Sequence, residues 1–141
     1  MKKIIMALLA LLLVVVEAGA ASVQARLVRA NNRGAQNDPA LKDIETKLKA
    51  QFGYNSYRQT GAGQQEIKTS DKLRFDLGED FRVLVTPKSA DKKQRELEIE
   101  WYSGKTLLVR STVKVIHNGH VFINGPQVGE NQILLAVSVR N

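Results

Sequence analysis

From Tyr54 to the end of the chain, apolar and polar side chains alternate at a spacing of two residues. This is the period of a β-strand with one buried face. The clearest segments are 72–77, 81–86 and 95–101, each bounded by turn-forming or polar residues. Because each such strand must bury a face, we predict a mainly β fold of about seven or eight short antiparallel strands. A sandwich of two sheets is expected, with a small barrel as the alternative.

Turn-forming residues predict where these strands end and how they pair. The first strand is expected to end at Gly61–Gly63. A three-residue loop over Tyr102–Gly104 would place Glu96 opposite Arg110. The dipeptide Asn118-Gly119 suits a tight type I′ turn, so we predict a second hairpin there.

Residues 38–53 follow a helical period instead. Asp38 suits an N-cap, Pro39 suits the first helical position, and Gly53 suits the left-handed residue that ends a helix. Apolar residues recur at spacings of three and four: Leu41, Ile44, Leu48 and Phe52. We therefore predict one N-terminal amphipathic α-helix whose apolar stripe packs on the sheet.

Residues 1–25 have the three-part layout of a secretory signal peptide: a basic start, an apolar run over Ile4–Val16, and small residues. A membrane anchor would need roughly 20 apolar residues, and Glu17 ends this run earlier. Cleavage is expected after Ala20, Ala21 or Ala25. The bond after Ala25 is preferred.

Cleavage after Ala25 would leave 116 residues, which suit a single domain. We predict an exposed basic lead-in over residues 26–37 and a single helix-plus-sandwich domain over residues 38–141. The chain contains no cysteine, so disulfides, thiol nucleophiles and acylation of a cysteine after the signal are excluded. No transmembrane anchor is expected once the leader is removed.

The mature part keeps nineteen basic and thirteen acidic side chains, a net charge of +6. Outside the cytoplasm, anionic surfaces are more frequent partners than nucleic acid, so we expect no nucleic acid and instead envelope proteins or anionic polysaccharide or lipid surfaces. The candidate contact residues are the basic side chains of the lead-in and of the polar segment 87–94: Arg26, Arg29, Arg33, Lys92 and Lys93.

Tyr54, Tyr57 and Arg58 follow the helix, and Tyr102 lies at a predicted bend. Exposed aromatic rings on a sandwich can stack on sugar rings, so these residues form a candidate carbohydrate site. In the alternative interpretation, they fill the seam between helix and sheet.

Two groups of side chains could form a catalytic or metal-binding site, and each also has a simpler structural explanation. Glu96, Glu98 and Glu100 form a carboxylate row of the kind used in glycoside hydrolysis, or the wet face of a strand. His117 and His120 flank a turn, but no third ligand accompanies them. The chain has no GxSxG motif. We therefore expect no catalytic residues, no metal and no cofactor.

The leading hypothesis is a non-catalytic, exported bacterial module for interaction or assembly in the cell envelope or outside the cell. It would be periplasmic or extracellular and soluble. Recognition would use strand addition at a sheet edge or a cationic surface. The alternatives are a small carbohydrate-binding module and, less favoured, a glutamate- or metal-based hydrolase.

Overall fold

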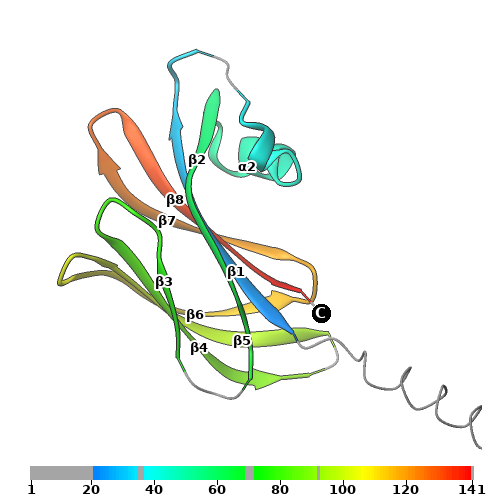
Figure 1. Cartoon of the computed structure of the whole chain (residues 1–141). Coiled ribbons are helices and arrows are strands. Elements are labelled where there is room, and N and C mark those ends of the chain that lie inside the picture. The colour runs from blue at the N-terminus through cyan, green and yellow to red at the C-terminus, as the bar shows by residue number, and fades with distance from the viewer. Residues whose placement is uncertain (1–20, 35–36, 69–71, 92, 141) are drawn as a thin grey trace, which may run out of the picture.

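The computed structural model describes residues 21–34, 37–68, 72–91 and 93–140. It confirms a mainly β fold in which two antiparallel four-stranded sheets pack as a sandwich (Figure 1). The strand orders are β2-β1-β8-β7 and β3-β4-β5-β6. The strands are β1 (Ser22–Asn31), β2 (Ser56–Glu66), β3 (Leu73–Asp76), β4 (Phe81–Ala90), β5 (Gln94–Ser103), β6 (Thr106–Ile116), β7 (His120–Val128) and β8 (Asn131–Arg140).

The main core lies between the two sheets and explains the two-residue period. Alternate residues of the central strands point inward and are fully buried, among them Val83, Val85, Leu97, Ile99, Ile133, Leu135 and Val137. Trp101 is the largest of these side chains, and its ring meets that of Phe81 edge to face at 5.9 Å between centroids. The predicted inward faces of the 81–86 and 95–101 segments are therefore correct.

The predicted exposed lead-in is wrong for its first half. Residues 26–31 belong to β1, which pairs with β2 on one side and β8 on the other. Leu27 faces the main core, whereas Val28 faces a second cluster on the opposite side of the sheet, and both are fully buried. A strand buried on both faces has no clean alternation, and the interspersed arginines hid it further.

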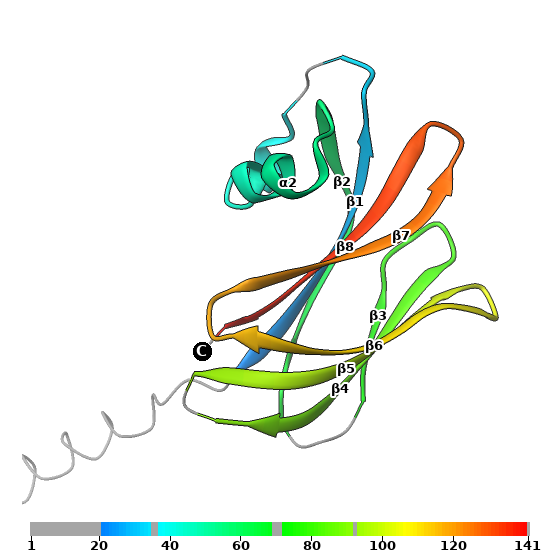
Figure 2. The same cartoon turned by 180° about the vertical axis from the view of Figure 1, so that it is seen from behind.

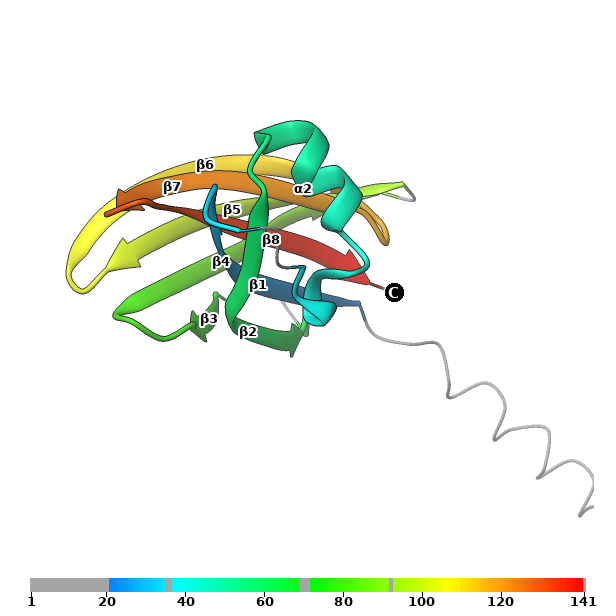
Figure 3. The ribbon, with the colours of Figure 1, turned by 90° about the horizontal axis from the view of Figure 1, so that it is seen from above.

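The helical segment covers the outer face of the β1–β8 sheet and is shorter than predicted. A 3₁₀ turn over Pro39–Leu41 is followed by one α-helix, α2 (Glu45–Phe52). Figure 3 shows α2 on the side of this sheet away from β3 and β4. The stripe residues Leu41, Ile44 and Leu48 are buried with apolar side chains of the sheet: Val28, Ala30, Leu134 and Ala136. Within the described residues, no helix has the length and apolarity needed to cross a bilayer.

Both predicted helix ends have the expected chemistry. The Asp38 carboxylate accepts a hydrogen bond from the backbone N–H of Ala40 at 3.0 Å, as an N-cap does. Gly53 adopts φ = 74°, and its N–H donates to the Lys49 carbonyl. Between these two ends, residues 42–44 form a turn, and Ile44 departs from helical geometry at the start of α2.

Gly61–Gly63 do not end a strand, contrary to the prediction. β2 continues through them to Glu66, with a register shift opposite Leu27 and Val28. A Cβ atom at Gly61 would overlap the Leu77 carbonyl oxygen, so this position needs glycine for close approach. Glycine here marks the contact between β2 and the β3–β4 connection, not a turn.

Two predicted pairings are also wrong. The β5–β6 turn uses two residues, Gly104 and Lys105, and the register shifts after Trp101, so Glu100 instead of Glu96 lies opposite Arg110. Asn118-Gly119 does form a tight turn, with φ = 65° at Asn118. However, this turn carries the chain from β6 in one sheet to β7 in the other, and it makes no hairpin (Figure 2).

Candidate functional site

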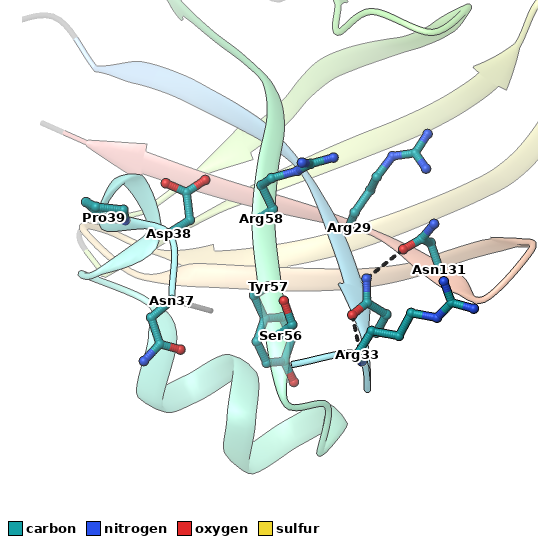
Figure 4. Close-up of a pocket in the computed structure, with 10 residues that line it drawn as sticks. Arg29, Arg33, Asn37, Asp38, Pro39, Ser56, Tyr57, Arg58 and Asn131 are labelled. Atoms are coloured by element: carbon teal, nitrogen blue, oxygen red, sulfur yellow. Dashed lines mark hydrogen bonds between the residues drawn. The ribbon is translucent and has the colours of Figure 1, made fainter. Parts of the chain in front are cut away.

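A hollow of about 520 Å³ opens at one end of the β1–β8 sheet, where β1 finishes and β2 and β8 begin (Figure 4). The side chains that line it are mostly polar: Arg29, Asn31, Arg33, Asn37, Asp38, Pro39, Ser56, Tyr57, Arg58 and Asn131. We call this hollow the arginine pocket. Its size lies within the range of small-ligand sites.

The sheet register brings two of the arginines together. Arg29 of β1 lies directly opposite Arg58 of β2 in the antiparallel pair. Like charges at directly opposed positions destabilise a sheet. Figure 4 shows both side chains extending in the same direction from their strands, with Arg33 below them. This local concentration of positive charge is the main electrostatic feature of the pocket.

The carboxylates nearby offset this charge only in part. Asp38 is the one acid among the described lining residues, and its two oxygens accept backbone N–H groups of Ala40 and Gln59, at 3.0 and 2.9 Å. Arg29 pairs with Glu79, whose side chain is half exposed. In the described part of the chain, no ion pair involves Arg58.

Asn31 and Asn131 fix the backbone next to the third arginine, Arg33. The Asn31 amide donates to the side-chain oxygen of Asn131 at 2.8 Å, which ties the end of β1 to the start of β8. The Asn31 side-chain oxygen accepts the Arg33 backbone N–H at 3.0 Å. Arg33 is 77% exposed at its side chain, and its guanidinium pairs with Glu130. The Arg33 backbone is therefore held beside the end of β1, and its side chain remains accessible.

The pocket unites residues that the sequence placed in two separate groups. Arg29 and Arg33 came from the basic lead-in, and Tyr57 and Arg58 from the aromatic segment after the helix. The asparagines Asn31, Asn37 and Asn131 were not predicted, because their role depends on strand ends that are distant in the sequence. The only sequence feature that could have pointed to these asparagines is their position beside predicted loop residues.

The remaining basic candidates lie elsewhere. Arg26 is buried on the opposite face of β1, near the helix. Lys93 lies in the short connection between β4 and β5, and Lys92 lies outside the described residues. The polar segment 87–94 is mostly strand, because β4 runs to Ala90 and β5 begins at Gln94.

The three tyrosines are not assembled into one surface. The Tyr57 ring is buried, and its hydroxyl donates to the Leu48 carbonyl and accepts the Tyr54 backbone N–H. It therefore fills the seam between the helix and the sheet. Tyr102 lies in the other sheet, where Arg82 sits over its ring at 5.0 Å and its hydroxyl donates to Glu100.

The glutamate row lies on the outer face of the second sheet among cations. Glu100 accepts from Arg110 at 3.0 Å and from Lys72 at 3.2 Å, and Glu98 pairs with Lys88 at 3.4 Å. Hydrogen bonds from Arg110 and then Lys72 lower the pKa of Glu100 below its usual value. A general acid would need a raised pKa, so this arrangement suits a charge-paired sheet face.

The two histidines turn to different partners. His117 Nε2 contacts the Asp91 carbonyl, whereas His120 Nε2 lies 3.2 Å from the Arg26 guanidinium. A guanidinium only donates, so His120 accepts at Nε2 and carries its proton on Nδ1. Among the described residues, no group of three potential metal ligands occurs.

Arg26 connects the helical segment to the sheet. Its guanidinium makes a two-pronged ion pair with Asp43, at 3.0 and 2.9 Å, while its side chain is almost fully buried. The hydrogen bond from Arg26 lowers the pKa of Asp43. Burial, followed by Arg26, Lys47 and Arg140, lowers the pKa of His120, against a smaller raising effect of Asp43. Protonated His120 would therefore face a guanidinium at close range.

Stability is expected to fall as the pH drops below the ordinary histidine value of 6.5. Because folding lowers the pKa of His120, the unfolded chain takes up this proton first, and acid favours unfolding until the folded pKa is passed. Urea unfolding at a series of pH values measures this change. His120→Phe should flatten the profile in this range. Equal profiles for His120→Phe and the unaltered protein would contradict the assignment.

Comparison with family models, with curated proteins and with solved structures finds no match for this chain.

Proposed function

We propose that this protein is an exported, non-catalytic binding module of a bacterial cell envelope, and that its arginine pocket holds an acidic group of a polysaccharide. The observation that carries the proposal is the direct opposition of Arg29 and Arg58 across β1 and β2, with Arg33 in the same lining. A bound carboxylate or sulfate would offset the repulsion that the sheet register imposes. Guanidinium groups are suited to this task because they bind oxyanions with paired hydrogen bonds.

The rest of the lining favours a sugar over a lipid surface. Asn37, Asn131 and Ser56 supply neutral hydrogen-bonding groups of the kind that hydroxyls use. Among the described residues of the lining, Pro39 is the only aliphatic side chain, so they offer little apolar surface to insert among acyl chains. An anionic lipid surface is therefore the less favoured partner.

Strand addition is also less supported than the pocket. The outer strands of the two sheets face each other: β2 approaches the β3–β4 connection at Gly61, and β6 turns directly into β7 at Asn118-Gly119. A partner strand would have to enter beside these neighbours.

The double variant Arg33→Gln, Arg58→Gln is expected to bind an acidic oligosaccharide at least about tenfold more weakly, because each charged hydrogen bond contributes about 1.5–3 kcal/mol. Calorimetric titration with oligogalacturonate measures the loss, and a neutral galactan of equal length serves as the ligand control. The unaltered protein should also bind more weakly at high salt.

A matched control removes the same charge at a distance from the pocket. Arg74 in β3 and Lys105 in the β5–β6 turn are exposed and belong to the other sheet. The double variant Arg74→Gln, Lys105→Gln should keep its affinity within about twofold. Equal losses in the two double variants would show that net charge, not the pocket, binds the ligand. Binding to anionic vesicles but not to oligogalacturonate would replace the polysaccharide with a lipid surface.

A further inference from the structure

The start of β1 bears directly on where the leader is removed, an inference that depends on the proposed export. Ser22–Ala25 form the first four positions of a strand with neighbours on both sides. Val23 and Ala25 are fully buried in the main core. A cut after Ala25, which the sequence alone favours, would remove these four residues from the folded domain.

Such a cut would also create a charge where the fold has no room for one. The new ammonium would stand at the backbone nitrogen of Arg26, a residue that lies between Ala62 and Ala136 in the middle of the sheet. Arg26 is only 4% exposed and already carries one buried positive charge. A second buried charge beside it has no partner, because Asp43 is engaged by the guanidinium.

The residue before the strand is also part of the fold. The Ala21 carbonyl accepts the Ile67 backbone N–H at 2.8 Å, which extends the β1–β2 ladder by one bond. A cut after Ala21 would replace this amide carbonyl with the start of the chain at Ser22 and lose the bond. A cut after Ala20 keeps it.

We propose that a signal peptidase hydrolyses the bond between Ala20 and Ala21. The sequence before this bond is Ala18-Gly19-Ala20, which provides the two small residues that such a peptidase requires. Water adds across the amide: the C–N bond breaks, the carbonyl carbon of Ala20 becomes a carboxylate, and the nitrogen of Ala21 leaves as an ammonium. This ammonium stands outside the strand ladder, where water can solvate it.

The test is the N-terminus of the exported protein. The full chain is produced with its own leader in a bacterial host, recovered from the envelope or medium, and analysed by intact mass and N-terminal sequencing. The expected start is Ala21-Ser22-Val23. A start at Ser22 or at Arg26 would overturn the proposed site but leave export standing. A chain that keeps residues 1–20 would overturn the site together with export.

Two variants distinguish cleavage after Ala20 from cleavage after Ala21. Ala20→Tyr puts a bulky side chain immediately before the proposed bond and should abolish the product that begins at residue 21. Ala21→Tyr, the matched control, should be processed to the same extent as the unaltered chain, because the small residues before the bond remain. Immunoblotting gives the processed fraction of each, and the reverse pattern would place the cut after Ala21.

Discussion

Replacing Trp101 with alanine is expected to lower the free energy of unfolding by about 3–5 kcal/mol. Trp101 is fully buried between the sheets, against Phe81 from β4 and the backbone near Gly125 from β7. It therefore joins elements of both sheets. Its indole N–H has no hydrogen-bond partner among the described residues, so the loss comes from packing and from the cavity left behind. Urea unfolding followed by circular dichroism measures the change.

Leu84→Ala is the matched control for this prediction. Leu84 lies on β4 directly opposite Glu100, so it points to the outer face of the same sheet, where it is half-buried. Its removal should cost about 1 kcal/mol, because less apolar surface returns to water. If Trp101→Ala cost no more than Leu84→Ala, the central position of the tryptophan between the sheets would be wrong.

Gly61→Ala is expected to destabilise the protein by about 3 kcal/mol, although it adds only one methyl group. The new Cβ would overlap the Leu77 carbonyl, which is backbone and cannot move aside as a flexible side chain can. The strand must shift away from the β3–β4 connection, which disturbs the contact between the two sheets at this side. Thermal or urea unfolding gives the loss.

Gly53→Ala is the comparison variant, because it introduces backbone strain without the atomic overlap expected at Gly61. Gly53 has φ = 74° at the end of α2, and an added Cβ would meet no atom within 4 Å. This variant should lose about 1 kcal/mol, the cost of placing alanine in the left-handed region. A loss at Gly61 no greater than the loss at Gly53 would show that β2 does not approach the second sheet so closely.

The sequence predicted the local features of this fold well. Alternation identified the inward faces of β4 and β5, since one face of each meets the core along its central residues. Gly53 ends α2 as predicted, whereas Asp38 caps the 3₁₀ turn at Pro39–Leu41 and not α2, whose N-cap is Ile44. The tight turn at Asn118-Gly119 was also correct as a turn.

The arginine pocket shows why the site could not be predicted in the same way. Arg29 and Arg58 are far apart in the sequence, and both were candidates for contact with a partner. They meet because the register between β1 and β2 skips Thr60, opposite the step from Leu27 to Val28. With an unbroken register, Arg29 would lie opposite Gln59. One extra residue in a strand thus decides whether two guanidinium groups share a site.

Sequence alone therefore determined the strand-rich class, the end of the helical segment at Gly53 and the absence of cysteine, because periods and caps are written in contiguous residues. Only the tertiary structure decided that β1 is a central strand buried on both faces, that the Asn118-Gly119 turn joins two sheets, and that three arginines meet at one end. Each of these depends on which distant strand lies alongside and on the position of a bulge. Burial and close contact between segments that are distant in the sequence select these strand neighbours, and local sequence patterns carry no information on them.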